Sequence, residues 1–243
     1  MDRSNMRQAT GEESVVTLSF EREMSAGEVE RIKRRLGARS ARQVPLAVGA
    51  AYDRARQVGF TKSSRPEVGA LMAVLAAAVP AGGRVLELGT GVGMGLAWVM
   101  HGLRGRADVV VVSVEVDTEK SELVSRAGWP DQVSLVVGDA REVLPGMGTF
   151  DLIFLDIPGG LKASLLEETV TALRPGGQLL IDDMNPYWSE DQTTRKSADR
   201  RDPERLLGDS RVICTELRYS SGMILGTRLS RRDACSRGET QFA

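Results

Sequence analysis

The chain has 243 residues, enough for one α/β domain with an appendage, and its length does not require a second domain. Hydrophobic residues make up 42% and charged residues 27%, as in ordinary globular proteins, while a net charge of −1 argues against a surface that coats nucleic acid. His101 is the only histidine, which argues against a histidine-based metal cluster and against a Ser-His-Asp triad.

The cysteine content and the absence of long apolar segments predict where the protein works. Cys214 and Cys235 are far apart and lack metal-ligand spacing, as expected in a reducing compartment. The N-terminus carries no apolar signal core, and no segment reaches eighteen uninterrupted apolar residues. We therefore expect a cytoplasmic protein without a membrane partner.

The first 80 residues predict a tail followed by helices. Residues 1–14 are polar and aperiodic, which predicts a disordered tail. A capping-box spacing begins at Ser25, and apolar residues then recur at helical intervals as far as Leu36. Further helices are predicted over residues 45–59 and 66–79, so we assign residues 15–80 to an N-terminal helical cap.

Between residues 81 and 230, apolar strands alternate with helical segments. Strands are predicted at 84–88, 109–115, 133–137, 150–156 and 178–182, with helices around 93–104, 118–127 and 161–173 and a short one after Asp139. Such a pattern is typical of a parallel sheet covered on both faces. An antiparallel hairpin is predicted at 211–217 and 223–229, followed by a second disordered tail over residues 231–243.

Residues 84–95 carry the strongest functional signal, because a strand runs here into a glycine turn and a helix start. Such a turn is where α/β folds hold nucleotide-like ligands. Counted from either of the first two glycines, the sixth position holds no glycine, so the dinucleotide-binding spacing is not met. The spacing that fits is acid-x-Gly-x-Gly-x-Gly, formed by Glu87, Gly89, Gly91 and Gly93.

Acidic residues also follow the next two strands. Glu115 is our candidate for accepting hydrogen bonds from two ribose hydroxyls, whereas Asp117 better fits the cap of the following helix. Asp139 fits either of two roles equally, accepting a hydrogen bond from an adenine amino group or capping a helix. Ala140 offers a backbone amide beside it.

Asp156, Asp182 and Asp183 follow two further strands, where they are expected to converge on one edge of the sheet. Oxygen-only ligands suit a hard cation, so these residues are a candidate Mg²⁺ site. The alternative is that Asp182 and Asp183 are turn residues.

The stretch from about Ser64 to Leu229 resembles class I methyltransferases that use S-adenosylmethionine (SAM), and more narrowly the bacterial and catechol-type O-methyltransferases. The resemblance is carried by residues 64–69, 87–93, 115 and 138–141 and by the three aspartates. It implies a Rossmann-like, doubly wound, mostly parallel seven-stranded sheet in the order 3-2-1-4-5-7-6, with the N-terminal helices as a substrate cap. Together with the motifs, the resemblance implies a cofactor-binding set of Glu87, Gly89, Thr90, Gly91, Gly93, Glu115, Val116, Gly138, Asp139, Ala140 and Asp156.

Two positions depart from the catechol-type pattern. Where that group has a general-base lysine three residues after the first metal aspartate, this chain has Gly159. The nearest lysine is Lys162, one helical turn further on, so Asp156 and Lys162 are the catalytic candidates. The third metal position holds Asp183 instead of the usual Asn.

The predicted function is methyl transfer from SAM to a hydroxyl of a small molecule, with Mg²⁺ as an optional aid and with Tyr187 and Trp188 in the acceptor wall. An RNA-modifying O-methyltransferase is an alternative, with the basic stretches 31–42 and 195–201 as contacts. A non-catalytic SAM-binding partner and an NAD oxidoreductase are two more. A homodimer is compatible with the sequence.

Overall fold

The computed structural model describes residues 44–184 and 205–230. The predicted helix from Ser25 to Leu36, both tails, both basic stretches and the Tyr187–Trp188 pair lie outside these residues. Within the described part of the chain, no helix is both long and apolar enough to cross a bilayer.

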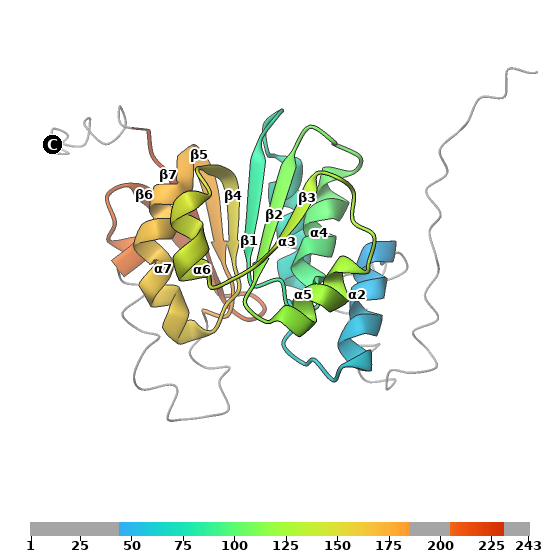
Figure 1. Ribbon diagram of the computed structural model, residues 1–243. Coiled ribbons are helices and arrows are strands. Elements are labelled where there is room, and N and C mark those ends of the chain that lie inside the picture. The colour runs from blue at the N-terminus through green and yellow to red at the C-terminus, as the bar shows by residue number, and fades with distance from the viewer. Residues whose placement is uncertain (1–43, 185–204, 231–243) are drawn as a thin grey trace, which may run out of the picture.

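A seven-stranded sheet in the order β3-β2-β1-β4-β5-β7-β6 forms the centre of the protein (Figure 1). Its strands are β1 (Arg84–Leu88), β2 (Val110–Glu115), β3 (Val133–Val137), β4 (Phe150–Leu155), β5 (Leu173–Ile181), β6 (Val212–Leu217) and β7 (Met223–Arg228). Strands β1 to β5 pair in parallel, and β7 runs antiparallel to both β5 and β6. The predicted sheet order is confirmed.

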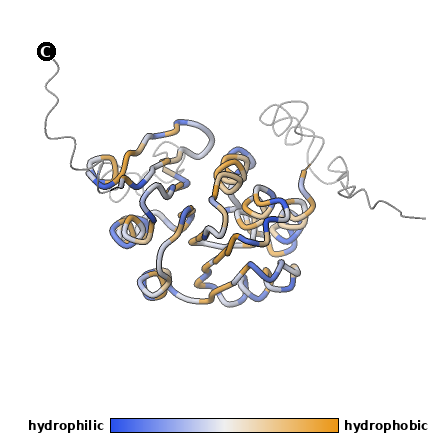
Figure 2. Tube along the Cα trace, turned by 90° about the horizontal axis from the view of Figure 1, so that it is seen from above, coloured by the Kyte–Doolittle hydropathy of each residue, from blue (hydrophilic) through white to orange (hydrophobic). Residues whose placement is uncertain are grey.

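Helices cover both faces of the sheet (Figures 1 and 2). They are α2 (Leu46–Gln57), α3 (Pro66–Ala77), α4 (Met94–Leu103), α5 (Thr118–Ser125), α6 (Ala140–Val143), the 3₁₀-helix η2 (Leu144–Gly146) and α7 (Gly159–Ala172). Residues of α2 to α5 belong to one buried cluster with the sheet, and residues of α7 belong to a second cluster on the opposite face.

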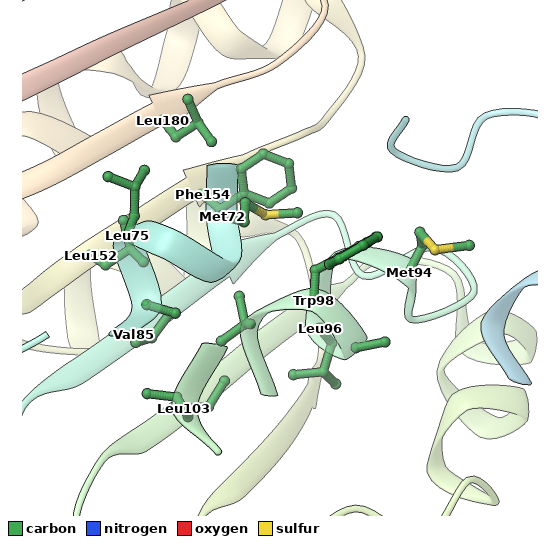
Figure 3. Packing of buried hydrophobic residues seen from close by; sticks show 14 of the residues in the cluster. Met72, Leu75, Val85, Met94, Leu96, Trp98, Leu103, Leu152, Phe154 and Leu180 are labelled. Carbon is green, nitrogen blue, oxygen red and sulfur yellow. The ribbon is translucent and has the colours of Figure 1, made fainter. Parts of the chain in front are cut away.

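Side-chain alternation along the strands separates these two clusters. In β4, Leu152 and Phe154 belong to the cluster on the α4 side, while Ile153 and Leu155 belong to the cluster on the α7 side. Figure 3 shows Phe154 beside Met72 of α3, within the first cluster. Because both faces are buried, the central strands are almost continuously apolar, which is why the sequence predicts them well.

Strand β5 begins earlier than predicted, at Leu173 rather than at residue 178. Phe150 of β4 pairs with Leu173 and Leu152 pairs with Gln178, so the intervening residues of β5 leave the register. This irregular segment contains a proline and Gly176, whose φ is left-handed. Both residues are typical of a turn.

The helices assigned to a cap are part of the layer on the sheet. Val48 of α2 and Met72 of α3 are fully buried in the same cluster as the strands. Helix α3 crosses α4 so closely that a Cβ atom added to Gly102 would lie 2.2 Å from the carbonyl oxygen of Ala73. Their role as a substrate cap stays a prediction.

We expect Gly102→Ala to destabilise the protein by about 1–3 kcal/mol, because the new methyl group meets backbone that cannot move alone. Gly146→Ala is the matched control, since a Cβ atom there meets nothing within 4 Å. Urea unfolding of both variants measures the difference. Equal stability of the two variants would contradict the close α3–α4 packing.

Candidate functional site

The carboxyl ends of the central strands meet along one edge of the sheet. Backbone hydrogen bonds continue past the strand ends, from the Gly89 amide to the Val114 carbonyl at 2.9 Å and from the Asp156 amide to the Leu88 carbonyl at 2.9 Å. The Asp182 amide donates to the Leu155 carbonyl at 3.1 Å. The residues that follow β1, β4 and β5 are thereby brought together, as the sequence predicts.

The glycine turn depends on missing side chains. Gly89, Gly91 and Gly93 have φ angles of 101°, 55° and 80°, which side-chain-bearing residues rarely adopt. At Gly89, a Cβ atom would lie 2.1 Å from the carbonyl oxygen of Asp156. The turn therefore passes directly over the end of β4, and protein atoms occupy the space beside each of its three glycines.

Glu115 holds this turn from the end of β2. One carboxylate oxygen accepts a hydrogen bond from the Gly91 amide at 2.7 Å, and the other accepts one from the Asp117 amide at 3.0 Å. Asp117 caps α5 by accepting from the Lys120 amide at 3.1 Å, as predicted. Each Glu115 oxygen keeps a further lone pair, so its predicted role as a ribose acceptor is compatible with these bonds.

Glu87 lies beneath the turn rather than open at the strand end. Its carboxyl shares a 2.5 Å hydrogen bond with Ser113, whose hydroxyl lies 2.5 Å from that of Thr90. A Cβ atom on Gly95 would lie 2.1 Å from the other carboxyl oxygen of Glu87, Oε1. This oxygen has no hydrogen-bond partner within the described residues. Burial raises the pKa of Glu87 to about 8. The Glu87 carboxyl is therefore enclosed beneath the turn and is not exposed at the strand end.

Two residues that the sequence analysis missed fix the turn from outside. The Nε of Arg54, on α2, donates to the Val92 carbonyl at 2.9 Å, and its guanidinium lies 5.9 Å from the centre of the Trp129 ring. The Phe60 ring lies 3.3 Å from the position of a Cβ atom on Gly91. No motif surrounds Arg54 or Phe60, so only the packing of α2 reveals them.

The segment after β3 has a capping role. The Asp139 carboxylate accepts from the Arg141 amide at 2.9 Å and caps α6. The Arg141 guanidinium beside it lowers the pKa of Asp139 to about 2. The Gly138 amide donates to the Glu115 carbonyl at 2.9 Å, which places this segment next to the end of β2. This capping role is compatible with the predicted contact between Asp139 and adenine. Val116, the residue that follows Glu115, is 67% exposed.

A second group of acids lies where β4 and β5 end. The Asp156 carboxylate accepts a hydrogen bond from the Ser64 hydroxyl at 3.0 Å. Asp182 is 2% exposed, and its Oδ1 accepts from the Ser221 hydroxyl and from the Asp183 amide. Burial, reinforced by the negative charge of Asp182, raises the pKa of Asp156 to about 7, and burial also raises the pKa of Asp182.

The predicted Mg²⁺ site on Asp156, Asp182 and Asp183 is not supported. Among the described residues, no three His, Cys, Asp or Glu side chains are grouped so that they could hold a metal ion. Asp183 is exposed, with a left-handed φ of 53°, whereas Asp182 is buried and already accepts hydrogen bonds from the protein. Lys162, on α7, is 3% exposed and donates to the Asp182 carbonyl at 2.6 Å.

Comparison with known proteins agrees with this arrangement. Residues 86–184, from β1 to just past β5, match a family described as a methyltransferase domain. These residues are therefore similar to that family over about two fifths of the chain. The matched segment holds the glycine turn, Glu115 and the three aspartates.

Proteins provisionally named O-methyltransferases are similar to the region that includes these matched residues. One from Mycolicibacterium vanbaalenii is 36% identical over 141 residues, which are 55% of this chain and 61% of that protein. One from Mycolicibacterium smegmatis is 35% identical over 142 residues, which are 55% of this chain and 65% of that protein. The chain thus spans somewhat less than two thirds of the length of these curated relatives.

Solved structures share the fold of this chain. The O-methyltransferase TomG from Streptomyces achromogenes, in complex with SAM, superposes with a TM-score of 0.66 at 23% identity over 77% of this chain and 92% of that chain. The SAH-bound methyltransferase PaMTH1 from Podospora anserina gives 0.71 at 21% identity over 85% and 97%. The predicted Rossmann-like fold is confirmed.

We expect Glu87→Gln to stabilise the protein increasingly as the pH rises from about 4.5 to about 8, and by a constant amount above that. The unfolded chain ionises Glu87 at its ordinary pKa, whereas burial keeps the folded form protonated, so native stability falls across this interval. Thermal unfolding of both proteins across the interval measures the effect. The exposed Glu142→Gln is the control. A stability difference between Glu87→Gln and wild type that stays constant from pH 4.5 to 8 would contradict the raised pKa of Glu87.

Proposed function

We propose that this protein transfers a methyl group from SAM to a hydroxyl oxygen of a small molecule. The observation that carries the proposal is that the glycine turn passes directly over Asp156, so the expected donor site and a carboxyl group adjoin at one edge of the sheet. The name given to the relatives from Mycolicibacterium and the SAM-bound TomG structure support the same donor and reaction class.

The residues around the turn suit SAM. The positive φ angles of Gly89, Gly91 and Gly93 shape the backbone of the turn along which SAM would lie. Glu115 would accept hydrogen bonds from the ribose hydroxyls, and the exposed Val116 offers an apolar surface for adenine. Glu87 would act from below by shaping the turn and the start of α4. When bound, SAM supplies a methyl group on a positively charged sulfur, which is suited to in-line displacement.

Glu115→Ala should weaken SAM binding by about tenfold or more, because it removes hydrogen bonds to a charged acceptor both from the ligand and from the Gly91 amide. Asp117→Ala is the matched control, since it removes the cap of α5 two residues away and leaves Glu115 in place. Calorimetric titration with SAM, and with NADH in parallel, measures both. Equal losses in the two variants, or binding of NADH instead of SAM, would contradict the proposed donor site.

On the acceptor side, Asp156 is the candidate general base. Its carboxylate is half-buried, is oriented by the Ser64 hydroxyl, and has a pKa raised toward neutrality. A base whose pKa lies near the working pH is the most effective in proton transfer. Asp156 would take the hydroxyl proton of the acceptor as its oxygen bonds to the methyl carbon and the carbon–sulfur bond breaks, leaving the bonding pair on sulfur.

Methyl transfer should therefore rise with pH through about 7 and level off above it, because burial raises the pKa of the Asp156 carboxyl that must be ionised. Asp156→Asn should lower the rate by about 100-fold or more and remove this pH dependence, while SAM still binds. The exposed Asp131→Asn, at the opposite end of the sheet, is the control.

The measurement is product mass after incubation with SAM and a panel of catechols and other hydroxylated small molecules. SAM binding without transfer to any hydroxyl acceptor would overturn the proposed reaction and favour a non-catalytic SAM-binding protein. A flat pH profile with intact activity would overturn the role of Asp156 alone.

A further inference from the structure

Lys162 is a buried cation that the proposed reaction does not use. It lies on α7, which covers the face of the sheet opposite α4, yet its Nζ reaches the end of β5 and donates to the Asp182 carbonyl at 2.6 Å. Its side chain is 3% exposed. Burying an ammonium group is strongly unfavourable unless opposite charges and hydrogen bonds compensate it, so its surroundings must supply negative charge.

That negative charge comes from the aspartates at the ends of β4 and β5. Lys162 acts electrostatically on both Asp156 and Asp182, and Asp183 adds its negative charge to each of them. The two carboxyls also repel one another when ionised. Ser64 and Ser221 donate hydrogen bonds to these carboxyls, but neither serine carries a charge. The lysine is thus the cation that the described residues place beside this pair.

We propose that Lys162 supplies, at the acceptor end of the site, the positive charge that keeps Asp156 and Asp182 together, so that this site works without a divalent metal ion. The described residues contain no group of three His, Cys, Asp or Glu side chains able to hold a metal ion, and the buried Asp182 is already engaged by Ser221 and the Asp183 amide. A divalent ion beside Asp182 would also be repelled by the buried ammonium group.

In this arrangement Lys162 is a positioning residue. Its ammonium group donates a hydrogen bond to the Asp182 backbone carbonyl, and we assign proton acceptance to Asp156. The charge pairing of Lys162 with the two aspartates does not depend on the proposed methyl transfer. Only its importance for catalysis rests on that proposed function. Its tests need no acceptor molecule, so their failure would leave the proposed O-methylation standing.

The first test measures metal binding. Full-length protein freed of metal with a chelator is titrated with Mn²⁺, and free Mn²⁺ is followed by electron paramagnetic resonance. We expect the signal of free Mn²⁺ to be the same with and without wild-type protein. Stoichiometric loss of that signal in wild type, abolished in Asp182→Asn, would show a metal ion in the place assigned to Lys162 and would overturn the proposal.

The second test measures charge pairing by a double-mutant cycle. At a pH above the raised Asp156 pKa of about 7, Lys162→Met should lower the melting temperature because two like charges then face each other, and adding Asp156→Asn should restore part of that loss. A purely packing role of Lys162 would make the two effects additive, and additivity would overturn the proposal. If Lys162→Met does not fold, folding of the double variant supports the pairing, and its failure to fold overturns it. Glu142→Gln, added to Lys162→Met, is the control for a distant charge.

Discussion

The contact between the glycine turn and the end of β4 is the constraint on which the rest of the site depends. With the Asp156 carbonyl oxygen 2.1 Å from where a Cβ atom of Gly89 would lie, the chain can leave β1 only over the neighbouring strand. That path brings the Gly91 amide to Glu115 and starts α4 above the buried Glu87, where Gly95 leaves the necessary space. The donor side and the acceptor side are therefore built on the same backbone contact.

The site also contains several acidic groups whose burial is unfavourable for folding. Glu87 and Asp182 are almost fully buried and Asp156 is half-buried, and burial raises the pKa of each. Serine hydroxyls from three different segments donate to these carboxyls, but a neutral donor offsets only part of the desolvation of a charge. The large apolar clusters on both faces of the sheet provide the stability that tolerates such a rim.

Much of the fold could be predicted because its signals are local. Continuous apolar runs bounded by turn residues gave the bounds of β1 and β3, and the acid-glycine spacing located the turn. The sheet order came from the family resemblance rather than from the strands themselves. Arg54 and Ser221 could not be found in this way, because they join the site only through tertiary packing. The proposed metal set failed for a related reason: sequence places three aspartates at one edge but cannot tell that one is buried and another exposed.

The hydrogen bond from Ser221 to Asp182 has a consequence for the order in which the protein becomes competent. The bond joins residues 39 positions apart, and Ser221 lies in the turn between the last two strands of the sheet. During synthesis, the glycine turn and Glu115 emerge long before this hairpin can pair with β5. The donor side can thus be completed early, whereas Asp182 acquires its Ser221 partner only when the C-terminal hairpin docks. The acceptor end is therefore complete only after the whole sheet has formed.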